Sequence, residues 1–226
     1  MAVGLVSRII VAIDGPAGSG KSSVAKELAR EFGFAYLDTG AAYRALAWAV
    51  LNGLDESALD SDDLDAKFKY DISTDPDDFW VRVGQDDVTE AIRTNLISEA
   101  VSKVAGNQNV RAYMKRLTHQ IAEDCNAPGI IIEGRDITTV VYPDADSRLL
   151  LTADEQVRIA RRSKQLADGE GHDLTRSVSK RDEADSKVVD FMNAAEGVTL
   201  IDSTNLDFDA TVEAMELQIR KDLEGR

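Results

Sequence analysis

The chain has 226 residues, 43% of them hydrophobic, and a formal net charge of −15. That length allows one sizeable core with a small additional subdomain, but not two full domains. The acidic balance excludes a general nucleic-acid-binding protein, which needs a basic surface for phosphate contacts, yet a few converging arginines can still hold one mononucleotide.

The first elements along the chain are a strand, a glycine-rich loop and a helix. Residues 9–13 form a short apolar run rich in β-branched side chains and followed by a Gly-Pro turn, which predicts a buried parallel strand. Apolar residues recur at helical spacing over residues 22–32, and Gly33 follows, where a left-handed cap costs little. Residues 35–37 predict a second strand and residues 39–51 an alanine-rich helix, so we expect an α/β fold with a parallel sheet.

Residues 55–90 have a different pattern. Acidic turns separate short segments at residues 68–72 and 79–83, and Phe79, Val81 and Val83 keep a period of two in the second segment. This pattern predicts a small antiparallel insertion with one exposed face. Helical patterning then resumes from residue 90 to about residue 125.

The rest of the chain returns to alternating strands and helices. Residues 130–132 are a fully apolar strand that ends at Glu133, and residues 147–151 predict another strand before a charged helix over residues 154–167 and a tip at residues 169–173. A final strand is expected at residues 198–201 and an amphipathic helix at residues 208–223.

The glycine-rich loop carries the strongest chemical signal. Residues 15–22 read Gly-Pro-Ala-Gly-Ser-Gly-Lys-Ser and fit the G-x-x-x-x-G-K-[ST] phosphate loop, between a predicted strand and a predicted helix as that motif requires. Glycines let successive backbone N–H groups point inward, and the helix adds its positive end. Lys21 supplies a mobile charge for the β- and γ-phosphates. The residues expected to hold the nucleotide are Gly15, Pro16, Ala17, Gly18, Ser19, Gly20, Lys21, Ser22 and Ser23.

A phosphate loop alone does not identify the acceptor, since GTPases, ATPases and small kinases all contain one. The Asn-Lys-x-Asp segment with which a GTPase reads its base is absent, and a motor-type ATPase is normally larger. Arginines are frequent in the segments after the loop, although any one of them alone is by default a surface charge. They are Arg44, Arg93, Arg111, Arg135, Arg158, Arg161, Arg162 and Arg181.

Several segments together resemble bacterial cytidylate kinases over about residues 9–220. They are residues 13–22 (Ile-Asp-Gly-Pro-Ala-Gly-Ser-Gly-Lys-Ser), 37–44 (Leu-Asp-Thr-Gly-Ala-Ala-Tyr-Arg), 92–94 (Ile-Arg-Thr), 133–136 (Glu-Gly-Arg-Asp), 140–145 (Val-Val-Tyr-Pro-Asp-Ala), 180–186 (Lys-Arg-Asp-Glu-Ala-Asp-Ser) and 201–204 (Ile-Asp-Ser-Thr). The resemblance implies ATP-dependent phosphorylation of CMP, and of dCMP, to the diphosphate. It also implies one domain of residues 8–222, with a core of residues 8–54 and 106–222, a monophosphate-binding insertion of about 55–105 and a helical lid of about 158–187.

The same resemblance assigns individual roles. Arg44 and Arg135 look like the arginines that clamp the acceptor phosphate, a task for which the planar guanidinium is suited. Arg181 and Asp185 resemble the pair that lies near the ribose hydroxyls. Arg158 and Arg162 resemble lid arginines that approach the phosphates of ATP. The full acceptor set is Thr39, Tyr43, Arg44, Ser102, Arg111, Arg135, Asp136, Arg181 and Asp185, of which Ser102, Arg111 and Asp136 resemble the residues that read cytosine. The expected catalytic residues are Lys21, Arg158 and Arg162.

Two positions depart from the family pattern. Where the family usually continues with Asn-Arg after Ser186, this chain has Lys187, which keeps a charge but loses bidentate geometry. Glu133 stands where the family often has Asp, one methylene shorter. We expect Ser22 to bind Mg²⁺ directly, with Glu133 acting through a water molecule.

Two other hypotheses stay open at this point. The chain could be another small P-loop kinase, with UMP or a metabolite as acceptor, or a nucleotide-switched binding protein without turnover. The single cysteine, Cys125, excludes an internal disulfide and fits a reducing cytosol. No apolar run approaches the ~20 residues that a bilayer requires. We therefore expect a cytoplasmic monomer that binds CMP, dCMP and ATP but neither nucleic-acid polymers nor membranes.

Overall fold

The computed structural model describes residues 8–61, 64–166 and 190–225. Its core is a parallel sheet of five strands, in the order β2-β6-β1-β7-β8. The strands are β1 (Ile9–Asp14), β2 (Ala35–Asp38), β6 (Gly129–Gly134), β7 (Ser147–Thr152) and β8 (Thr199–Asp202). Each predicted strand is confirmed to within one or two residues at either end.

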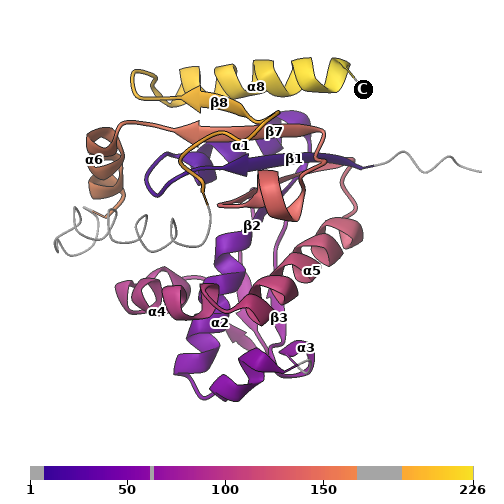
Figure 1. The fold of residues 1–226 in the computed structure, drawn as a ribbon, viewed down its shortest axis with the longest axis vertical. Coiled ribbons are helices and arrows are strands. Elements are labelled where there is room, and N and C mark those ends of the chain that lie inside the picture. Colours follow the sequence, from indigo (N-terminus) through magenta and orange to yellow (C-terminus); the bar gives the residue numbers. More distant parts are fainter. Residues whose placement is uncertain (1–7, 62–63, 167–189, 226) are drawn as a thin grey trace, which may run out of the picture.

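The two faces of the sheet are covered by different helices. Alternate side chains of β1 point to opposite faces, so Val11 and Ile13 pack with α1 (Lys21–Phe32) and α8 (Phe208–Glu224), whereas Ala12 packs toward α2 (Thr39–Leu51) and α5 (Gln108–Asp124). Figure 1 shows α8 running along the sheet, whereas α2 and α5 lead away from it. The elements between α2 and α5 in the chain form a separate part of the structure, called the second lobe below. Burial on both faces explains why the strands read as continuous apolar runs.

The predicted insertion forms the second lobe. It begins with η1 (Glu56–Asp60) and α3 (Leu64–Lys67), continues through β3 (Tyr70–Ile72), β4 (Val81–Val83) and β5 (Asp86–Asp87), and ends with η2 (Ala91–Arg93) and α4 (Asn95–Ala105). The three short strands pair in an antiparallel sheet, as the sequence predicts. One face is exposed, because Val81 is fully buried while Arg82 faces solvent.

The helical patterning expected over residues 90–125 is confirmed, and the structure divides it among three elements. After the 3₁₀ turn η2, the chain forms α4 and α5, which are separated at Gly106 and Asn107. The side-chain oxygen of Asn107 accepts hydrogen bonds from the backbone of Asn109 (2.8 Å) and Val110 (3.2 Å), and so starts a new helix.

The second half of the chain places α6 (Glu155–Leu166) after β7, and a π-helix, η3 (Ile137–Val141), directly after β6. The sequence did not predict η3. The expected tip at residues 169–173 and most of the expected lid lie outside the described residues. None of the helices in the described part of the chain is both long and apolar enough to cross a membrane.

Candidate active site

The carboxyl ends of the five parallel strands lie at one edge of the sheet. The arrowheads of β1 and β7 in Figure 1 point to the side on which α6 lies. Four of these ends lead into segments that the sequence analysis singled out. The phosphate loop follows β1, α2 follows β2, the Gly-Arg-Asp segment lies at the end of β6, and α6 follows β7. Parallel pairing therefore brings together segments that are far apart in the sequence.

The phosphate loop is pressed against β7 and α6 on its outer side. A Cβ atom added to Gly15 would collide with the carbonyl oxygen of Leu151, and one added to Gly18 would lie 2.5 Å from the carbonyl oxygen of Arg158. Gly18 and Gly20 have φ angles of 77° and 92°, in the left-handed region that favours glycine. Close packing thus requires glycine at positions 15 and 18, and backbone conformation favours glycine at positions 18 and 20.

Two arginines of α6 support this loop. Arg158 is only 4% exposed and donates to the carbonyl oxygens of Ala17 (2.9 Å) and Ala153 (3.1 Å). Arg161 donates to the carbonyl oxygen of Ser19 (3.2 Å) and to that of Ser203 (2.8 Å), which lies just after β8. In this structure the predicted lid residue Arg158 therefore contacts the loop backbone. The side chain of Arg162 lies outside the described part of the structure.

Asp38, the last residue of β2, joins several positive side chains. One carboxylate oxygen accepts from the backbone of Ala41 and caps α2, and the other lies 3.0 Å from Arg93 and 3.9 Å from Arg44. Burial alone would raise the pKa of Asp38, but the charges of Arg93, Arg44 and Lys21 outweigh it and lower the pKa to about 2. Asp38 is therefore a stable anion among cations.

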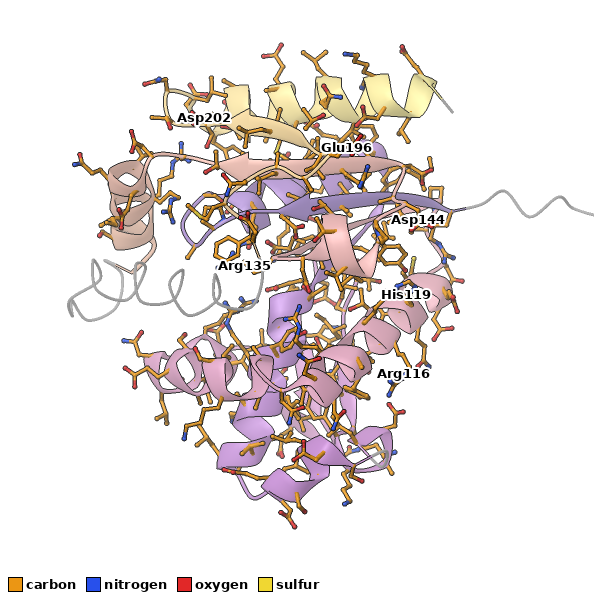
Figure 2. The ribbon with its side chains drawn as sticks, viewed as in Figure 1. Arg116, His119, Arg135, Asp144, Glu196 and Asp202 are labelled. Carbon is orange, nitrogen blue, oxygen red and sulfur yellow. The ribbon has the colours of Figure 1, made fainter. Side chains whose placement is uncertain are left out.

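The two arginines of the expected phosphate clamp have different surroundings. Arg44 is deeply placed on α2, and burial lowers its pKa despite the neighbouring Asp38. Arg135 donates to the carbonyl oxygen of Gly15 in the phosphate loop, and its guanidinium lies 4.9 Å from the centre of the Phe191 ring. Figure 2 labels Arg135 between the sheet and the second lobe.

Glu133 lies near the end of β6 and is 1% exposed. Its Oε1 accepts a hydrogen bond from the Tyr36 hydroxyl at 2.5 Å, and its Oε2 has no hydrogen-bond partner but lies 3.8 Å from Lys21 Nζ. The predicted acceptor residue Thr39 donates to the backbone oxygen of Glu133 at 2.7 Å. Ser22 follows Lys21 in the first turn of α1.

Asp136 and Arg111, both predicted to read the base, form an ion pair of 2.5 Å. Burial raises the pKa of the Asp136 carboxyl, and the charge of Arg111 opposes this shift. Tyr43 lies close enough to this pair to feel both charges, and burial raises its pKa to about 12. Ser102 is exposed on α4, and no described contact joins it to the pair. Arg181, Asp185 and Lys187 lie outside the described residues.

The sequence did not assign roles to four residues that the structure places at this edge. Asp38 and Asp14 were noticed only as parts of longer motifs, Arg161 only as one of the frequent arginines, and Tyr36 only as part of a predicted strand. Asp14 accepts from the backbone of Ile137 (2.9 Å) and from both the backbone (2.8 Å) and the hydroxyl (2.6 Å) of Thr138. It thereby ties the start of the phosphate loop to η3, a contact that no local pattern reveals.

The parallel α/β sheet and the phosphate loop between β1 and α1 define a P-loop nucleotide-binding protein. The family model for cytidylate kinase matches residues 11–221. A cytidylate kinase from Cutibacterium acnes is 42% identical over 215 residues, covering 92% of this chain and 95% of that protein. Another, from Lactococcus lactis, is 40% identical over 228 residues, covering 96% and 99% respectively. The chain belongs to the cytidylate kinase family.

Similarity to solved structures supports the fold alone. A crystal structure of an uncharacterized protein from Eubacterium ventriosum superposes with a TM-score of 0.50 and 13% sequence identity, covering 94% of this chain and 99% of that one.

Proposed function

We propose that this protein transfers the γ-phosphoryl group of ATP to CMP or dCMP and releases ADP with CDP or dCDP. One structural observation carries the proposal within the family. Three segments that are distant in the sequence meet at the carboxyl ends of adjacent strands: the phosphate loop after β1, the Asp-Thr-Gly-Ala-Ala-Tyr-Arg segment after β2 and the Gly-Arg-Asp segment after β6.

The donor half of the site is the phosphate loop. In the proposal, residues 15–23 hold the phosphates of ATP, and Lys21 places its charge on the β- and γ-phosphates. Arg158 and Arg161 shape the loop through its backbone carbonyl oxygens, as their hydrogen bonds to Ala17 and Ser19 indicate. Arg158 and Arg162 are proposed to approach the phosphates only when the donor is bound.

Magnesium is proposed to bind next to this loop. A hydroxyl and a carboxylate are hard oxygen ligands that suit Mg²⁺, and the buried Oε2 of Glu133 has no hydrogen-bond partner of its own. Ser22 would supply the direct ligand and Glu133 would act through a water molecule. When bound, the ion neutralises charge on the transferring phosphoryl group.

The acceptor half uses the ends of β2 and β6. Arg44 and Arg135 are proposed to hold the phosphate of CMP, with Thr39 and Tyr43 beside them. The Asp136–Arg111 pair is proposed to read cytosine, since a carboxylate accepts from the exocyclic amine and a guanidinium donates to N3 and O2. Ser102, Arg181 and Asp185 complete the proposed acceptor set.

The chemistry needs little covalent help from the protein. The attacking oxygen of CMP is already anionic, so no general base is required, and catalysis comes from alignment and from cations around the equatorial oxygens. The cluster of Lys21, Arg44 and Arg93 around Asp38 supplies such cations before substrate binds.

A coupled assay that follows ADP formation tests the proposal. Wild-type protein is given ATP and Mg²⁺ with CMP, dCMP, UMP, AMP or GMP in turn, and Lys21→Met serves as the inactive variant, with Lys221→Met on the exposed side of α8 as a matched control. We expect the highest kcat/KM with CMP or dCMP, and a loss of kcat of about 100-fold or more in Lys21→Met. Preference for UMP or another acceptor, or no turnover at all, would favour one of the two other hypotheses.

A further inference from the structure

The contact between Tyr36 and Glu133 joins two buried side chains from neighbouring strands. Each is 1% exposed, and the hydroxyl–carboxylate distance is 2.5 Å. Hydrogen bonds to an ionised acceptor are short and strong. A buried carboxylate that loses such a bond no longer has a partner to offset the cost of its removal from water. The hydroxyl therefore fixes one of the two carboxylate oxygens of Glu133.

This bond makes the two oxygens of Glu133 different. Oε1 is occupied by Tyr36, whereas Oε2 has no hydrogen-bond partner. Lys21 Nζ lies 3.8 Å from Oε2, which is longer than the usual ~2.7–2.9 Å of a charge-assisted hydrogen bond. Glu133 Oε2 and Lys21 Nζ thus form an ion pair that is longer than a hydrogen-bonded one.

Tyr36 itself has little freedom to move. Its Cα is paired with that of Ile131 of β6, and its backbone N–H donates to the carbonyl oxygen of Thr74 at 2.9 Å. Lys26 Nζ lies 5.3 Å from its ring centre, and the Phe79 ring lies 6.3 Å away. The hydroxyl is the donor in the contact with Glu133, and these neighbours hold the ring that carries it.

We propose that Tyr36 is a positioning residue whose hydroxyl holds Glu133 so that Oε2 stays directed to the magnesium ion, or to its water shell, and does not close onto Lys21. The inference rests on the part of the proposed function that places Mg²⁺·ATP beside Glu133. Tyr36 touches neither substrate nor metal in this account, and it acts only through the carboxylate.

A purely structural role is the alternative, in which the hydroxyl merely satisfies a buried carboxylate. That role would affect the folded protein equally with or without magnesium. Positioning, in contrast, should affect only binding that involves the ion, because partners that orient metal-binding groups typically change metal affinity by about 10–100-fold.

Calorimetric titration of ATP, without CMP, separates the two roles. Tyr36→Phe removes only the hydroxyl, and Tyr142→Phe, at a half-buried tyrosine that stacks on His119, is the matched control. We expect Tyr36→Phe to bind ATP about tenfold more weakly in excess Mg²⁺ and unchanged in excess EDTA, while Tyr142→Phe matches wild type in both. An equal loss in both conditions, or no loss in either, would overturn the inference.

A double-mutant cycle tests whether Tyr36 acts through Glu133. In a Glu133→Gln background, adding Tyr36→Phe should change Mg²⁺-dependent ATP binding by less than about twofold, because the group to be positioned is already altered. A further tenfold loss would contradict the inference. If Tyr36→Phe does not fold, Glu133→Asp serves instead, because its shorter side chain should lose the contact with the hydroxyl. This variant should show the same Mg²⁺-dependent weakening of ATP binding. ATP binding equal to that of wild type would then refute the inference.

The outcomes also separate this inference from the function beneath it. A wild-type protein that does not phosphorylate CMP would refute the proposed function. An active wild type whose Mg²⁺-dependent ATP binding survives Tyr36→Phe would refute the inference alone.

Discussion

In the proposed site, the Asp136–Arg111 pair would read the base through two side chains. Cytosine presents an amino donor where uracil presents a carbonyl oxygen, so a carboxylate distinguishes the two bases by hydrogen-bond direction. The sequence left open a second role for Asp136, in which it only holds the adjacent Arg135 in place. In the structure Asp136 has a second neighbour, Arg111 of α5, at 2.5 Å, and a variant of Asp136 can distinguish the two roles.

Asp136→Asn should therefore lose activity with CMP while its preference for CMP over UMP narrows, since a carboxamide can both donate and accept. Mispairing of buried polar groups is typically worth a discrimination of several orders of magnitude, about 10⁴-fold in favourable cases. The measurement is kcat/KM for both acceptors. An equal loss with CMP and UMP would assign Asp136 to positioning and base choice to another residue.

Asp38 makes the stability of the protein depend on pH. Its pKa is lowered from 3.8 to about 2, so the unfolded state takes up this proton first as the pH falls. The contribution of Asp38 is thus fully present above about pH 4 and is lost between about pH 4 and pH 2. A shift of this size corresponds to roughly 2 kcal/mol.

Asp38→Asn should accordingly lower the free energy of unfolding by roughly 2 kcal/mol at pH 7 and by progressively less as the pH approaches 2. Asparagine can still cap α2, so the helix start should survive. Urea unfolding at several pH values measures both curves. A difference between wild type and variant that stays constant from pH 7 to pH 3 would contradict the assigned ion pairs.

At the scale of elements, the end of α5 is held by Arg8, the residue directly before β1. The Arg8 guanidinium donates to the carbonyl oxygens of Glu123 (3.0 Å) and Ala127 (3.2 Å), and also to those of Ala122 and Cys125. Carbonyls at a helix C-terminus lack partners within the helix, and a cation there also complements the helix dipole. Arg8 therefore connects the core sheet to the helix that enters the second lobe.

Arg8→Met should destabilise the protein by about 1–2 kcal/mol while keeping most of the aliphatic stem. Arg116→Met is the matched control, because Arg116 is exposed on α5 (labelled in Figure 2) and its guanidinium lies 5.9 Å from the centre of the Tyr113 ring. We expect the control to change stability by less than about 0.5 kcal/mol. Equal urea midpoints for both variants would show that Arg8 does not hold the helix end.

Elements with a strong local pattern could be predicted from the sequence. The apolar runs at residues 9–13 and 130–132, the glycine-rich loop and the helical spacing of residues 22–32 all depend on neighbours in the chain, and each was found where expected. The position of the break at Asn107 was not predicted because helical spacing is strong on both sides of it, and the change of phase between Val104 and Val110 was overlooked. The π-helix η3 was missed because the Asp14 carboxylate that binds its start is 123 residues away.

The same limit applies to the candidate site. The phosphate loop and the Arg111–Asp136 pair come from motifs, and the structure places them together at one sheet edge. Tyr36 and Arg161 act through contacts with residues 97 and 42 positions away, so their importance depends on the parallel pairing of strands rather than on any local sequence. Only the three-dimensional structure can reveal such residues.

At the scale of the whole molecule, the protein is acidic, but the positive side chains of the candidate site lie together at the carboxyl edge of the parallel sheet. The net charge is −15, yet Lys21, Arg44, Arg93, Arg111 and Arg135 all follow or face the carboxyl ends of the sheet strands. Local positive charge of this kind can hold phosphates in an acidic chain, because buried and partly buried pairs are screened less than surface charges. In the proposed function, both nucleotides would bind along this one cationic edge.

Direct transfer between these two nucleotides is the central claim. The measurement is a single-turnover reaction of enzyme with γ-labelled ATP, Mg²⁺ and CMP, with the labelled products separated by chromatography. We predict that the label appears in CDP at the rate at which ADP forms, with little label in free phosphate, since the site transfers to an acceptor and excludes water. Label that appears mainly in free phosphate, or that remains bound to the protein, would contradict direct transfer to CMP.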